Sequence, residues 1–159
     1  LSDAILRLFP IEQPSRLIEF KDPRYPLYTA ADSGNATYKY VNYYELLGER
    51  VNVDSFALMV RSVARKLYEL DSNIIERMTR NHEKLYGWIN PVFSCEKTEV
   101  KRPVKLLNDK EIYISTGYSA YDCISFIRGL LRKYELNIDE DFVYSARTTR
   151  QNNTTEDGQ

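Results

Sequence analysis

The sequence is poor in the residues that carry most enzyme and metal chemistry. Among 159 residues it has one histidine, His82, and two cysteines, Cys95 and Cys123. His82 lies in the polar run Arg-Asn-His-Glu-Lys at 80–84, which is typical of a solvated surface and not of a general base. A zinc site needs three or four clustered ligands. These scattered residues therefore exclude a zinc site of the usual kind, and we expect no metal and no cofactor.

Glycine is also scarce, and its placement excludes the common phosphate-binding loops. The six glycines are isolated from one another. They form neither G-x-G-x-x-G nor G-x-x-x-x-G-K, and no G-x-S-x-G nucleophile turn is present. The sequence thus predicts no catalytic residue, and we expect a non-enzymatic protein.

Long hydrophobic runs and paired cysteines are missing as well. No apolar run approaches the ~20 residues of a membrane-spanning helix, and no signal-peptide pattern is present. The two cysteines lie far apart and form no C-x-x-C pair, which favours free, buried thiols in a reducing compartment. We therefore expect a soluble, cytoplasmic protein without membrane contact.

The charges of the two signs almost cancel. The chain has 22 Lys and Arg against 23 Asp and Glu, with a net charge of -1 and a pI near 6.0. It lacks the overall positive field of a dedicated nucleic-acid binder, so any contact with DNA requires a local basic patch.

The residues that are present fit one folded domain, because 43% are hydrophobic and 28% are charged. Three longer helices are predicted, and each begins at a capping residue. The first follows Asp54 or Ser55, the second starts at 71–72, and the third opens with the S-x-x-D pattern of Ser119 to Asp122. Apolar residues at three- and four-residue steps give the first and third helices one buried face each. The first face carries Phe56, Val60, Val63, Leu67 and Leu70, and the other carries Ile124, Ile127, Leu131 and Tyr134. The predicted core consists of these residues without Leu70 and Tyr134, together with the strand around Ile112 and Ile114.

The strands are predicted from their β-branched and aromatic residues. Residues 38–47 and 50–53 form a hairpin with a turn at 48–49, and residues 104–115 form a second hairpin with a turn at 108–109. Further strands are expected at 17–20, at 88–93 as a broken strand, and at 142–144. A short helix is expected at 2–9.

The expected fold is one α+β domain over residues 1–147, with two hairpin–helix units at 38–80 and 101–147. Two or three helices pack on mostly antiparallel strands, and residues 148–159 form a disordered tail. Because the chain begins at Leu1 with a helical pattern already under way, we expect it to be part of a longer protein.

Tyrosine is the one unusual feature of the composition. Six of the 13 tyrosines fall between Tyr25 and Tyr44. Half-buried strands favour tyrosine, with the ring packed and the hydroxyl in water, and this is the favoured interpretation. The alternative is a tyrosine-rich surface for stacking or for a protein partner.

Basic residues form two pairs with helical spacing. Arg61 and Arg65 lie one turn apart on the first predicted helix, and Arg128 and Arg132 repeat the spacing on the third. Two cations on one exposed helix face can bind phosphates. An ordinary solvated helix face gives the same pattern, so both interpretations stay open. If the chain contacts DNA, the candidates are these four arginines with Lys101 and Arg102 in the loop between them.

A magnesium-dependent nuclease is a weaker hypothesis. Nucleases of the restriction type carry E-x-K on a strand, and the tripeptide occurs at 19–21 and again at 99–101. A three-residue pattern is expected by chance in a chain this rich in charge, and no aspartate is placed on a neighbouring strand. The acidic run at 139–141 is interpreted as a solvated turn.

Residues 101–147 resemble a known accessory domain. The segment reads Arg-Pro-Val-Lys at 102–105, Ile-Tyr-Ile-Ser-Thr-Gly-Tyr-Ser-Ala at 112–120, a helix at 124–131, Tyr-Glu-Leu-Asn-Ile at 134–138 and Phe-Val-Tyr at 142–144. It is similar to a C-terminal domain of unassigned activity in bacterial restriction- and defence-type proteins, and 46–70 fits the earlier part of that pattern. The sequence departs from the pattern at 117–118, where an asparagine is usual, and at Glu135, where glycine is usual.

The resemblance implies a module that recognises or assembles while another domain performs the chemistry. The leading hypothesis is a non-catalytic accessory module of a larger bacterial restriction- or defence-type protein, contacting DNA or another domain of the same chain. The first alternative is a protein–protein or oligomerisation module that uses the tyrosine-rich sheet. The nuclease is the second alternative.

Overall fold

The computed structural model describes residues 26–148. The helix predicted at 2–9 and the strand predicted at 17–20 lie outside the described residues, as does the tail predicted at 148–159 except for its first residue. Within the described part the protein is α+β, with three α-helices and two antiparallel sheets of four and three strands. The predicted fold class is confirmed.

The larger sheet has its last strand in the middle. Its strand order is β1 (Leu27–Thr29), β7 (Phe142–Arg147), β2 (Tyr40–Leu46) and β3 (Glu49–Asn52). All neighbouring strands are antiparallel. The predicted final strand is therefore confirmed. Its position joins the two hairpin–helix units in one sheet.

The turn of the first hairpin lies one residue earlier than predicted. Leu46 pairs with Glu49, so the two turn residues are Leu47 and Gly48. Both have positive φ, 52° and 87°. Positive φ at both central residues is the geometry that matches the twist of a two-residue hairpin. Gly48 supplies it freely, while Leu47 adopts it against its preference.

The three helices begin at residues that the sequence indicated. Ser55 and Ser119 accept hydrogen bonds from backbone N–H groups three residues on, and Asp71 accepts one from two residues on. Each cap satisfies an N–H group that the helix itself leaves unpaired. The helices run from Phe56 to Leu70 (α3), from Ser72 to Asn81 (α4) and from Ala120 to Lys133 (α5).

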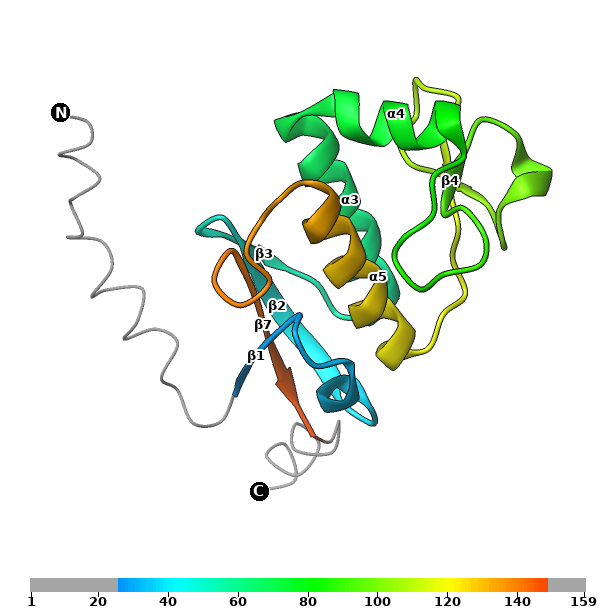
Figure 1. The fold of residues 1–159 in the computed structure, drawn as a ribbon. Helices are drawn as coiled ribbons and strands as arrows, with labels where there is room; N and C mark the ends of the chain where they lie inside the picture. The colour runs from blue at the N-terminus through cyan, green and yellow to red at the C-terminus, as the bar shows by residue number, and fades with distance from the viewer. Residues whose placement is uncertain (1–25, 149–159) are drawn as a thin grey trace, which may run out of the picture.

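Helices α3 and α5 pack side by side between the two sheets (Figure 1). The predicted core residues of α3, α5 and the strand at 112–114 are all buried. Of the residues predicted on the two apolar faces, Leu70 alone is exposed. Leu70 is 57% exposed because it ends α3, where the chain turns away towards α4. The helix phasing is confirmed everywhere else.

The second sheet is small. Its strands are β4 (Phe93–Ser94), β6 (Tyr113–Ile114) and β5 (Val104–Lys105), in that order. The hairpin of β5 and β6 is confirmed. A broken strand was predicted at 88–93. Only Phe93 of that range lies in a strand, β4, and residues 88–92 form a loop.

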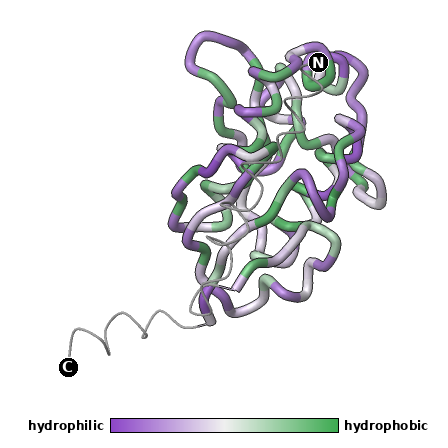
Figure 2. The backbone as a smooth tube through the Cα atoms, turned by 90° about the vertical axis from the view of Figure 1, so that its left-hand side faces the viewer, coloured by the Kyte–Doolittle hydropathy of each residue, from purple (hydrophilic) through white to green (hydrophobic). Residues whose placement is uncertain are grey.

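Hydrophobic and hydrophilic residues are mixed along the backbone (Figure 2). Among the helices of residues 26–148, none has the length and apolar character that crossing a bilayer requires.

Candidate functional site

A tight turn links the second sheet to α5, and two other segments fix it. We call residues 115–118 the Gly117 turn. The Ser115 N–H donates to the carbonyl of Val92 at 2.9 Å, and the Thr116 N–H donates to the carbonyl of Lys101 at 2.9 Å. The Thr116 hydroxyl donates to the carbonyl of Arg102 at 2.7 Å. The turn is therefore held in one conformation by the loop at 101–102.

Three cationic side chains from two separate segments meet at this turn. Arg61 on α3 lines a small recess together with Thr116 and Gly117. The Lys101 ammonium donates to the carbonyl oxygen of Gly117 at 2.9 Å. The Arg102 side chain lies directly over Gly117, because a Cβ atom added there would be 2.7 Å from the Arg102 Cδ. The structure thus brings together three of the six residues that the sequence proposed.

Glycine is required at the centre of this cluster. Gly117 has a φ of 87°, a conformation that side chains disfavour. Glycine also leaves the room that Arg102 occupies.

The positive charge at the turn is not neutralised by the described part of the chain. No carboxylate among residues 26–148 lies within ion-pair distance of Arg61, Lys101 or Arg102. Other cations of the same region do have such partners, namely Arg50, Lys66, Arg77, Lys105 and Lys133. An anion can therefore approach the turn without displacing a described carboxylate.

Arg65 lies one helical turn further along α3. Its Nε donates to the carbonyl of Leu106 at 2.8 Å, which ties the helix to the β5–β6 hairpin. The residue is nevertheless exposed, whereas Arg61 is half-buried with its Nε enclosed. The predicted pair therefore continues the positive charge of the Gly117 turn along α3. Arg65 is more accessible to an anion than Arg61.

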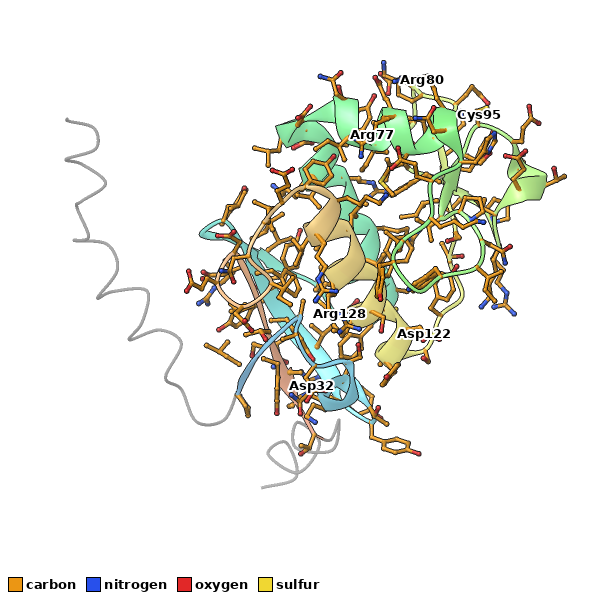
Figure 3. The ribbon with its side chains drawn as sticks, in the orientation of Figure 1. Asp32, Arg77, Arg80, Cys95, Asp122 and Arg128 are labelled. Atoms are coloured by element: carbon orange, nitrogen blue, oxygen red, sulfur yellow. The ribbon has the colours of Figure 1, made fainter. Side chains whose placement is uncertain are left out.

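The second predicted pair belongs to another place in the fold. Arg128 points from α5 to the segment after β1, where it donates to the carbonyl of Ala30 at 3.0 Å and to the Ser33 hydroxyl at 2.9 Å (Figure 3). It thereby ties α5 to the 3-10 helix η1 (Ser33–Ala36). The expectation of an exposed Arg128 is wrong, because these contacts half-bury the guanidinium. Arg132 is exposed.

A groove next to the Gly117 turn, which we call the Trp88 groove, was not foreseen from the sequence. It is open, has a volume of about 630 Å³, and lies between residues 87–91, residues 98–101 and the start of α5. Trp88 and Tyr118 line it with their rings 5.2 Å apart in an edge-on contact. Trp88 also packs edge-on against Phe126 at 5.6 Å. The one sequence signal for it was the single tryptophan, which was interpreted as part of a strand.

Two carboxylates line the same groove. Glu99, at the end of the 3-10 helix η2 (Lys97–Glu99), accepts a hydrogen bond from Ser94 and lies 3.3 Å from the Nδ1 of His82. Asp122 stands in the first turn of α5 (Figure 3). Its carboxylate has no hydrogen-bond or ion-pair partner among the residues described.

The described residues form no nuclease or metal site. Glu99 and Lys101 of the second E-x-K tripeptide engage different partners, and the first tripeptide lies outside the described residues. Between residues 26 and 148, no three acidic, histidine or cysteine residues are grouped to hold a metal ion. Cys95 is exposed, contrary to the expectation of two buried thiols, while burial raises the pKa of Cys123 to about 12.

The tyrosines of the larger sheet are mostly used inside the fold. The Tyr44 ring is fully buried, and its hydroxyl is 2.6 Å from that of Ser62 on α3. Tyr28 packs on Tyr144 at 5.5 Å. Tyr38 is the clear exception, at 90% exposed. The half-buried interpretation is therefore confirmed for Tyr28, while Tyr44 is buried more completely than that interpretation expects.

A search of protein-family models, of curated proteins and of solved structures found no match to this chain.

Proposed function

We propose that this chain is a non-catalytic accessory module of a larger bacterial restriction- or defence-type protein, and that it contacts the DNA backbone through the Gly117 turn. The observation that carries the proposal is the convergence of Arg61, Lys101 and Arg102 without a described carboxylate partner. The resemblance of residues 101–147 to accessory domains supports the proposal that the larger protein is of the restriction or defence type. A cytoplasmic location and contact with other domains of the same chain belong to this proposal.

The chemistry of the turn suits phosphate groups better than bases. Arginine and lysine supply charge-assisted hydrogen bonds to phosphate oxygens. Such contacts position a protein on DNA and carry little sequence information. An almost neutral chain can bind in this way only if its positive charge is concentrated locally. We therefore expect weak binding that depends strongly on salt and little on DNA sequence.

The test is a gel-shift titration of the chain with duplex DNA at several salt concentrations. Replacing Arg61→Glu together with Arg102→Glu should abolish the shift, because both positions then repel phosphate. The matched control is Arg80→Glu with Lys84→Glu, which makes the same charge change at exposed positions on and just after α4. Loss of a single contact, as in Arg102→Gln, should flatten the salt slope by about one unit.

Two results would contradict the proposal. One is a parent chain that shifts no DNA at low salt. The other is equal loss of binding in the Arg80/Lys84 control, which would mean that only net charge matters. Circular dichroism checks that the double variant is folded, and Arg102→Glu alone repeats the test at an exposed site if it is not.

The two alternatives have weaker support. Oligomerisation through the tyrosine-rich sheet would need exposed rings, and Tyr28 and Tyr44 are committed to internal packing. Sedimentation of the parent and of Tyr38→Ala tests that alternative. Cleavage of the same duplex on addition of magnesium would instead support the nuclease.

A further inference from the structure

We infer that the groove between residues 87–91, residues 98–101 and the start of α5 binds an extended, basic peptide segment of a partner protein. The groove is separate from the DNA contact in its chemistry, although Lys101 borders both. Its exposed aromatic and aliphatic side chains, and the carboxylates placed beside them, favour such an occupant.

Several large apolar side chains of the groove and its edges are exposed. Trp88, Pro91 and Tyr118 form part of the groove, and Ile89 on its wall is 82% exposed. Tyr86 and Tyr121, next to lining residues in the sequence, are 87% and 52% exposed. Large apolar side chains gathered in this way mark interaction surfaces. Grooves lined by aromatic residues accept extended and proline-containing peptides.

The charge of the groove selects a basic occupant. Asp122 has no described partner, and the Glu99 side chain is 39% exposed. The only cation among the lining residues, Lys101, directs its ammonium to the Gly117 carbonyl and lies 4.3 Å from the centre of the Tyr118 ring. Two carboxylates stand against this one cation, so the lining residues carry a net negative charge. They repel phosphate and attract lysine or arginine.

The aromatic rings reinforce that selection. A lysine or arginine over the face of tryptophan or tyrosine is attracted by the π electrons of the ring. Trp88 and Tyr118 contact each other edge-on, so their faces are not stacked on one another. Lys101 on Tyr118 shows that one ring of the groove already accepts a cation. A basic peptide is therefore favoured over a nucleic acid as the occupant.

Trp88 makes the test direct, because it is the only tryptophan among 159 residues. Its fluorescence is titrated in the 159-residue chain with a short synthetic peptide of alternating arginine and proline. We expect a saturable change in emission. Asp122→Lys should weaken the apparent affinity about tenfold, because an attraction at the rim becomes a repulsion.

The matched control is Asp109→Lys, the same change at an exposed residue of the β5–β6 turn, which should leave the affinity within about twofold of the parent. Three outcomes would overturn the inference. The first is that the Trp88 emission does not change, and the second is that a glutamate–proline peptide binds as tightly as the arginine–proline peptide. The third is that Asp109→Lys weakens binding as much as Asp122→Lys. Stronger quenching by oligothymidine than by the basic peptide would assign the groove to nucleic acid instead.

Discussion

The two sheets of this protein are built in different ways. In the larger sheet, β2 has seven residues and β7 has six, and they pair along their whole length with one irregularity, between Val41 and Tyr43. In the smaller sheet each strand has two residues. The region at 82–118 instead depends on buried side chains that insert into the helix layer, such as Phe93, Leu106 and Ile114.

The difference shows where function can be placed. The larger sheet with α3 and α5 is a rigid framework, since its residues are committed to pairing and packing. The loops at 82–118 form little regular strand pairing, so more of their surface side chains are available to contact a ligand. Both the Gly117 turn and the Trp88 groove lie in these loops, and the framework contributes only Arg61, Arg65 and the first turn of α5.

The largest expected effect tests the framework. Leu67→Ala removes a fully buried side chain from α3 and should cost about 2–5 kcal/mol of unfolding free energy in a denaturant titration. Leu70→Ala, one turn on but 57% exposed, should cost less than about 0.5 kcal/mol. Similar losses for both would mean that the helix buries a different face.

The next effect tests the loop region at its tightest point. Gly117→Ala places a Cβ atom 2.7 Å from the Arg102 Cδ in a backbone with a φ of 87°. We expect a loss of about 1–2 kcal/mol in thermal unfolding, together with weaker DNA binding because Arg102 is displaced. Unchanged stability and binding would show that the turn adapts freely and does not position the cations.

A smaller effect tests the junction between α4 and α5. Glu83, just beyond α4, accepts hydrogen bonds from Arg77 at 2.7 Å and from Lys133 on α5 at 2.8 Å. These partners lower the pKa of Glu83 from 4.5 to about 2. A lowered folded-state pKa adds stability that is complete above pH 4.5 and is lost as the pH falls towards 2.

Glu83→Gln should therefore cost about 1 kcal/mol at pH 7, and its unfolding free energy should approach that of the parent as the pH falls from 4.5 to 2. Denaturant titrations at several pH values measure the difference. A gap between the two proteins that does not depend on pH would contradict the ion-pair explanation.

The smallest effect is a gain, at the end of α5. Glu135 has a φ of 58°, and the Leu136 N–H reaches back to the carbonyl of Leu131 at 2.9 Å, as in a helix end that favours glycine. Glu135→Gly should raise stability by about 0.5–1 kcal/mol, whereas Leu136→Gly should not. A loss in Glu135→Gly would mean that the glutamate side chain is itself stabilising.

Sequence alone predicted the local elements well. The caps at Ser55, Asp71 and Ser119 and the apolar spacing of α3 and α5 fixed where the helices begin and which faces are buried. The hairpins also followed from short-range patterns, with an error of one residue at Leu47. The Trp88 groove escaped prediction because its walls come from three segments that no local pattern relates.

What the sequence by itself determined is the set of helices, hairpins and apolar faces, because each depends on neighbours within a few residues along the chain. The tertiary structure decided the rest. It placed β7 between β1 and β2, committed Arg128 to Ala30 and Ser33, and brought Arg61 to the Gly117 turn with Lys101 and Arg102. These are contacts between distant residues, and the spacing of charges along a helix gives no information about what the rest of the chain packs against it.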